Sequence, residues 1–116
     1  MTKTMKELRN DWITALRSGE YVQARGGLCR NGGYCCLGVA AKVIGISDDI
    51  LEDTDSGGAR NAYEDIKKAY GLEHSLGIYN DGSHALYTHN DSDKWNFNQI
   101  ADLIETAPSG LFIQDE

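Results

Sequence analysis

The spacing of apolar residues predicts a capped helix near each end of the chain. At the start, Thr4 and Glu7 have capping-box spacing and Gly19 supplies a left-handed stop. Apolar side chains recur at helical intervals between these signals, at Met5, Leu8, Trp12, Ala15 and Leu16. Towards the end, Asn96 is followed three residues later by a glutamine, and Pro108 breaks the pattern. We therefore expect one helix to stop at Gly19 and another to run from Asn96 towards Pro108.

The middle of the chain carries two further helical patterns separated by an acidic segment. Residues 37–44 are apolar and rich in alanine, which predicts a short buried helix because no polar face is present. Asn61 and Glu64 have capping spacing, and Gly71 is a stop signal, so a second amphipathic helix is predicted there. Residues 47–60 are acidic and contain glycines, and we expect them to form an exposed loop.

Short apolar runs around glycine-rich turns predict two hairpins. Residues 28–30 and 34–36 flank Asn31-Gly32-Gly33, and 77–79 and 84–87 bracket a turn with an Asp-Gly step. Residues 21–24 have the pattern of a short strand, and 111–113 that of a final edge strand. Length and pattern together predict a single α+β domain over residues 1–116, with three or four short helices packed on a small antiparallel sheet built from hairpins.

The number of cysteines and the lack of long apolar runs indicate the cellular compartment. The three cysteines, Cys29, Cys35 and Cys36, are too few and odd in number for a secreted disulfide framework, so we expect reduced thiols. On a predicted strand, Cys35 and Cys36 point to opposite faces and cannot bind one ion together. The sequence contains no run of 18 apolar residues and no apolar leader after Met1. These features predict a cytoplasmic protein without a membrane partner.

Charge is divided unevenly along the chain. The net charge is −7, but residues 1–46 carry seven Lys/Arg against three Asp/Glu (+4), and residues 47–116 carry four against fifteen (−11). Because duplex DNA binding depends on neutralising phosphates, the acidic whole disfavours that function. The basic first part is the candidate binder of a small anion.

The spacing and surroundings of the candidate residues disfavour catalytic and metal-binding interpretations. The cysteines and His74, His84 and His89 match no structural zinc spacing. A cysteine nucleophile with a histidine base lacks any local sign of thiolate activation. The segment from Asp53 to Glu64 echoes a calcium loop, but its fifth and eighth positions depart from the pattern, and an ordinary acidic loop is favoured. We therefore predict no enzyme, no catalytic residue, no metal site and no cofactor.

The basic part of the chain holds the residue types that recognise nucleotides. Arginine forks match phosphate oxygens, tyrosine rings stack on bases, and glutamine pairs with a base edge. The candidates are Tyr21, Gln23, Arg25, Arg30 and Tyr34. The alternative interpretation of these residues is a solvated strand face. Trp95 likewise is either the edge of the core or a shelf for a ligand.

The chain resembles a widespread family of small phage-encoded proteins. The resemblance lies first in Trp12-x-x-Ala15-Leu16-x-Ser18-Gly19-x-Tyr21-x-Gln23 and Cys35-Cys36-Leu37-Gly38-Val39. It extends to Asn90-Asp91, Phe97-x-x-Ile100-Ala101-x-x-Ile104-Glu105 and Pro108-x-Gly110-Leu111-Phe112. The chain departs from the pattern at its direct Gly27-Leu28 step and in its short acidic centre.

The chain is also similar to phage sponge proteins of the anti-CBASS class, which sequester cyclic nucleotide signals of bacterial immunity. This resemblance implies a homo-oligomer that binds a cyclic dinucleotide or related signal in the cytoplasm of an infected bacterium and does not cleave it. It adds Asn90 and Asp91 to the candidate ligand contacts. A phage host-takeover factor that inhibits a bacterial protein by direct binding is the alternative, favoured by the acidic residues 47–116.

Overall fold

The computed structural model describes residues 3–24, 28–30, 32–53, 57–74, 77–79, 84–108 and 110–113. Six helices lie within these ranges: α1 (Met5–Arg17), α2 (Cys36–Val43), α3 (Asp48–Glu52), α4 (Gly58–Tyr70), α5 (Leu86–Asp91) and α6 (Phe97–Thr106). Two antiparallel pairs of strands accompany them, β1 (Cys29–Arg30) with β2 (Gly33–Tyr34) and β3 (Ile78–Tyr79) with β4 (His84–Ala85). The α+β class is confirmed, with more helices than expected and with the two hairpins as separate sheets.

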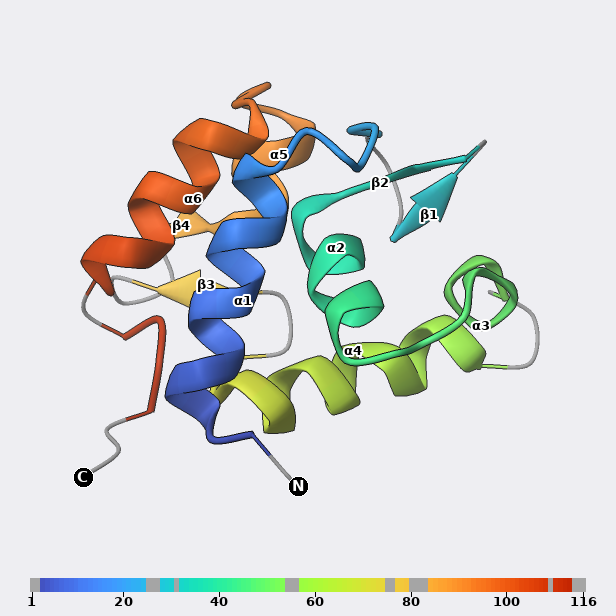
Figure 1. The fold of residues 1–116 in the computed structure, drawn as a ribbon, viewed down its shortest axis with the longest axis horizontal. Helices are drawn as coiled ribbons and strands as arrows, with labels where there is room; N and C mark the ends of the chain where they lie inside the picture. Colours follow the sequence, from blue (N-terminus) through green and yellow to red (C-terminus); the bar gives the residue numbers. More distant parts are fainter. Residues whose placement is uncertain are drawn as a thin grey trace.

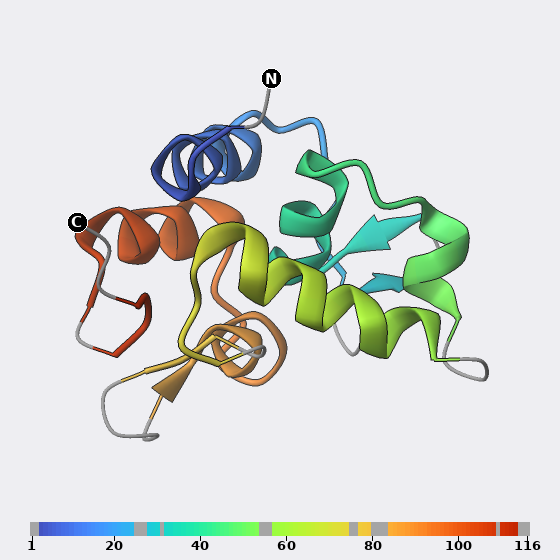
Figure 2. The same ribbon diagram turned by 90° about the horizontal axis from the view of Figure 1, so that it is seen from below.

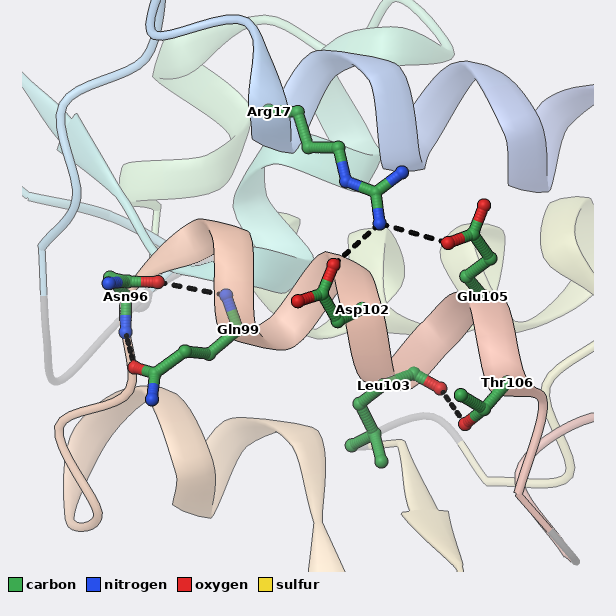
Figure 3. Close-up of polar contacts among 7 residues, drawn as sticks. All are labelled: Arg17, Asn96, Gln99, Asp102, Leu103, Glu105 and Thr106. Atoms are coloured by element: carbon green, nitrogen blue, oxygen red, sulfur yellow. Dashed lines mark hydrogen bonds and ion pairs between the residues drawn. The ribbon is translucent and has the colours of Figure 1, made fainter.

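Helices α1 and α6 lie side by side and are capped by their own sequences (Figure 1). Thr4 accepts a hydrogen bond from the Glu7 N–H, and Asn96 accepts one from the Gln99 N–H, which completes a capping box at each N-terminus. Arg17 of α1 donates to Asp102 and Glu105 of α6 across the exposed seam at 2.6 and 3.0 Å (Figure 3). Both predicted helices are confirmed, and α6 ends at Thr106.

All six helices contribute side chains to one buried cluster. Helix α6 lies between α1 and the segment that contains α5 and the β3–β4 hairpin, and α4 crosses below α1 and α2 (Figure 2). One buried residue from each helix illustrates the cluster: Trp12, Leu37, Leu51, Ile66, Leu86 and Ile100. No helix in the described ranges is long and apolar enough to cross a membrane.

The paired cysteines do not lie on a strand, which corrects the prediction. The β1–β2 hairpin ends at Tyr34, and Cys35 is the N-cap of α2, with its sulfur accepting a hydrogen bond from the Gly38 N–H. Cys36 is the first residue of the helix and is fully buried. A Cβ on Gly38 would lie 1.9 Å from the Leu28 carbonyl oxygen, so glycine allows α2 to begin directly against the hairpin.

Three boundaries in the centre also differ from expectation. Residues 48–52 form α3 instead of an exposed loop, because Leu51 is buried and Asp48 and Asp49 favour the positive end of a helix. Helix α4 begins at Gly58, three residues before the predicted cap at Asn61. The strand predicted over 84–87 stops at Ala85 and gives way to α5, and the 111–113 segment makes only an isolated bridge from Phe112 to Leu72.

Candidate ligand-binding site

The segment 21–24, predicted as a short strand, forms only an isolated parallel bridge beside β2. Gln23 forms a bridge with Tyr34, the Ala24 N–H donates to the Tyr34 carbonyl, and the Tyr34 N–H donates to the Val22 carbonyl, both at 2.8 Å. This pairing brings residues from before and after the glycine-rich turns into one small sheet. It therefore places Tyr21, Gln23 and Tyr34 next to one another.

Tyr21 and Tyr34 form an edge-to-face aromatic pair. Their ring centroids are 5.5 Å apart with an interplanar angle of 85°, and both side chains are half-buried. The Tyr34 hydroxyl donates to Asp48, which also pairs with Lys42 at 2.9 Å. Burial and the hydrogen bond to Asp48 raise the pKa of Tyr34 to about 12. The hydroxyl is thus engaged within the protein, and the Lys42 ammonium lies over the ring, 6.0 Å from its centroid, so the half-exposed remainder of the ring is the part that a ligand can reach.

Gln23 and Asn90 meet at the centre of a polar hub. We define this hub as the two side-chain amides together with the backbone groups of Ala24, Cys36 and Trp95 that they bind. The Gln23 amide donates to Asn90 Oδ1 at 2.9 Å and to the Trp95 carbonyl at 2.7 Å. Asn90 Oδ1 also accepts from the Cys36 N–H, and its Nδ2 donates to the Ala24 carbonyl.

The hub has the geometry of a structural joint. Asn90 has an exposed fraction of 0%, and its amide oxygen and nitrogen each have two partners. A buried polar group that is fully hydrogen-bonded stabilises one backbone arrangement, because any other would leave it unpaired. In the described structure, these two residues hold the site together from within.

The remaining candidates are distributed around this core. Asp91 is half-buried and accepts from Asn90 Nδ2 at 2.8 Å. Arg30 is exposed, and since it pairs with Gly33 while Tyr34 pairs with Cys29, it lies on the opposite face of the hairpin from Tyr34. Arg25 lies outside the described residues.

A second aromatic and polar group, centred on His89, escaped the sequence prediction. His89 Nδ1 lies 2.7 Å from Asp93 Oδ2, and His89 Nε2 lies 2.6 Å from the Tyr79 hydroxyl. Burial, with a smaller contribution from Asp93, raises the pKa of Tyr79. His89 is 4% exposed, and its ring stacks on Trp95 at 4.0 Å with an interplanar angle of 5°. The only sequence signal for this group is the i,i+4 spacing of His89 and Asp93. That spacing indicates a contact only near a helix, and a strand was predicted over residues 84–87, where α5 begins.

The three cysteines are free and buried. Burial is the main cause that raises the pKa of Cys29 and of Cys35 to about 11, and it also raises the pKa of Cys36 well above its ordinary value. Thiols with raised pKa values remain protonated at neutral pH and are poor nucleophiles. Within the described ranges, no three His, Cys, Asp or Glu side chains lie close enough together to hold a metal ion.

The comparisons with known proteins give a family but no function. A family model described as a domain of unknown function (DUF8296) matches residues 3–64, which include α1, the first hairpin and α2. No curated protein and no solved structure matches the chain.

Proposed function

We propose that this chain, which belongs to the DUF8296 family of unknown function, is a phage counter-defence protein that captures a cyclic oligonucleotide signal without cleaving it. The observation that carries the proposal is the Tyr21–Tyr34 pair. Two half-exposed rings at fixed positions offer a preorganised surface for nucleobases, and every base has a face that stacks. The resemblance to sponge proteins favours the same ligand class.

The hub supports the proposal by keeping the aromatic pair rigid. Gln23 is bonded to Asn90 and Trp95, and it is paired through the backbone with Tyr34. A ligand therefore meets a backbone that does not need to be ordered on binding, which lowers the entropic cost of association. In this proposal Gln23 and Asn90 are positioning residues, and the direct contacts come from the tyrosine rings.

Arg30 supplies the phosphate contact in this proposal. It is exposed at the edge of the same hairpin, in the part of the chain with a net charge of +4. Arg30 lies on the opposite face of the hairpin from Tyr34, so in this proposal the ligand reaches around β1, and a phosphate of the cyclic oligonucleotide meets the arginine there. Arg25, the other predicted arginine, follows directly after the described segment 3–24.

Capture without cleavage is favoured by the state of the thiols. Cys29 and Cys35 have pKa values of about 11, which removes the simplest candidate nucleophiles next to the site. In this proposal the protein acts in the cytoplasm of an infected bacterium. It does so as a homo-oligomer, because a 116-residue chain offers little room for a deep cavity around a dinucleotide. Light scattering during gel filtration tests the oligomer directly.

Isothermal titration against a panel of cyclic di- and trinucleotides tests the proposed function. We expect micromolar or tighter binding to at least one of them, and about a tenfold loss of affinity in Arg30→Ala, since hydrogen bonds to a charged phosphate are among the strong ones. Lys68→Ala, which removes one exposed positive charge from α4, is the matched control. Ligand recovered unchanged after heat denaturation would support capture. No heat of binding with any cyclic nucleotide at high micromolar concentration would contradict the function.

The acidic part of the chain favours one alternative, inhibition of a host protein by direct binding. Residues 47–116 carry a net charge of −11, and α4 exposes Glu64 and Asp65 side by side. A surface of this sign suits a basic partner, including a protein whose normal ligand is nucleic acid. A stoichiometric complex with one host protein, together with no response to any cyclic nucleotide, would favour this alternative.

A further inference from the structure

The short segment 93–95 between α5 and α6 combines strain, charge and an aromatic ring. Lys94 has a φ of 59°, in the left-handed region that is unfavourable for a residue with a Cβ. Such conformations persist only where the surroundings impose them, and they are concentrated at ligand-binding sites. The residues on either side of Lys94 are the Asp93 that pairs with His89 and the Trp95 that stacks on it.

Trp95 is fixed in place through its backbone and through one face of its ring. Its N–H donates to the His89 carbonyl at 2.9 Å, and its carbonyl accepts from Gln23 at 2.7 Å. The His89 ring lies parallel to it at 4.0 Å. Yet Trp95 is only half-buried, unlike Trp12, which has an exposed fraction of 0%. The two sequence-based alternatives, core edge and ligand shelf, are thus compatible, because Trp95 packs against the core and remains partly open to solvent.

The ring beneath Trp95 is itself held on both sides. Asp93 engages His89 Nδ1, and the Tyr79 hydroxyl engages Nε2, so the imidazole cannot rotate without losing a buried hydrogen bond. Stacking on a ring that cannot turn keeps the Trp95 plane constant. Tyr79, His89 and Asp93 are therefore positioning residues for Trp95.

Lys94 adds a positive charge at this point. It is exposed, and among the described residues it makes no ion pair. A lysine ammonium is a strongly hydrated point charge that binds phosphate without a fixed geometry. A ring for stacking and a cation on adjacent residues match the two chemical halves of one nucleotide, its base and its phosphate.

We infer that Lys94 and Trp95 form a nucleotide subsite, in which one base of the captured ligand stacks on Trp95 and its phosphate meets Lys94. This inference rests on the proposed function and deepens it, because it assigns a contact outside the hairpin. The subsite is joined to the tyrosine pair through Gln23, which binds the Trp95 carbonyl and lies beside Tyr34 in the sheet.

Tryptophan fluorescence tests the subsite, because Trp12 and Trp95 are the only tryptophans in the chain. The probes are cyclic di-adenylate and cyclic tri-adenylate, with titration calorimetry on the same samples. We expect the bound probe to quench emission in the wild type and to leave emission unchanged in Trp95→Phe, which retains only the buried Trp12. Affinity should fall about tenfold in Trp95→Ala, which removes the stacking ring.

Lys94 variants separate charge from backbone strain. We expect Lys94→Ala and Lys94→Gly to bind the probe about fivefold more weakly, and Lys94→Arg to bind as the wild type does. Lys94→Gly should unfold at a higher temperature than Lys94→Ala, since glycine adopts the left-handed conformation freely. Weak binding in a variant that is more stable cannot be attributed to unfolding.

The outcomes distinguish the subsite from the proposed function. If calorimetry detects binding that Arg30→Ala weakens, while Trp95 emission and the affinities of the Trp95 and Lys94 variants stay unchanged, the subsite is wrong and the function stands. If neither probe nor any other cyclic nucleotide binds, both are wrong. Quenching that follows Lys94 and Trp95 supports both.

Discussion

The helical frame and the polar hub of this protein are stabilised in different ways. We define the frame as α1 and α6 with their caps. It consists of elements whose signals lie within a few residues of each other, such as Thr4 with Glu7 and Asn96 with Gln99. The hub depends on contacts between Gln23 and Asn90, which are 67 positions apart in the sequence. The start signals of the frame helices are therefore local, although the two helices pack together across the chain, whereas the hub exists only through a few long-range hydrogen bonds.

Removal of the Asn90 side chain from the hub should have the largest effect on stability. Asn90→Ala leaves the Cys36 N–H and the Ala24 carbonyl without their amide partner in a buried setting. We expect a loss of about 3 kcal/mol or more in the free energy of unfolding, because each buried polar group left unpaired costs about 1–3 kcal/mol. Urea unfolding followed by circular dichroism measures this loss.

The exposed Asn98 of α6 provides the matched control for that experiment. Asn98→Ala removes the same side chain from the frame and should change the stability by less than about 0.5 kcal/mol. An equal effect of the two substitutions would show that the hub is not the irreplaceable joint that its geometry indicates.

A cap substitution in the frame should have an intermediate effect. Asn96→Ala removes the acceptor for the Gln99 N–H at the start of α6 (Figure 3). A lost N-cap costs about 1 kcal/mol, and the rest of the frame should remain folded. The measurement is the urea midpoint, with Arg17→Ala as a comparison, because that exposed ion pair should matter less than the cap. A larger loss for Arg17→Ala than for Asn96→Ala would reverse our ranking of the frame contacts.

The smallest effect is expected from Asp48, which lies outside the hub and binds Lys42 and the Tyr34 hydroxyl. Hydrogen bonds from Lys42 and Tyr34 lower the pKa of its carboxyl group in the folded protein. A group with a lowered pKa stabilises the fold above its unfolded pKa of about 4, and that contribution is lost as the pH falls through the folded value. As the pH is lowered from about 5 to about 2, the thermal unfolding temperature of the wild type should therefore fall more than that of Asp48→Asn. Parallel pH profiles for the two proteins would contradict this assignment.

The frame could be predicted from sequence because its signals are local. The capping boxes of α1 and α6 and the stop at Gly19 follow from residue types within one turn. The antiparallel β1–β2 hairpin lies outside the frame, and its turn signal is equally local. The buried helix α2 was also predicted, since a run without a polar face must be covered on every side.

The hub and its neighbours could not be predicted because their determinants are distant or unusual. A cysteine is a rare N-cap, so Cys35 gave no start signal for α2. The stretch Leu86-Tyr87-Thr88 has the composition of a strand, yet it begins α5, which carries His89 and Asn90 into the interior. Tyr21, Gln23 and Tyr34 were predicted as ligand contacts from their residue types, and the sequence could not show that the Gln23 amide is used inside the protein.

The positions of the cysteines allow local opening around the hub to be measured separately from global unfolding. All three thiols lie at the first hairpin and the start of α2, and the frame contains none. A buried thiol reacts with a soluble disulfide reagent only when its surroundings open, so the rate of labelling measures local opening in place of global unfolding. The chain thus carries a native set of reporters for the motions of the very region to which we assign ligand capture, and a bound ligand should slow their reaction.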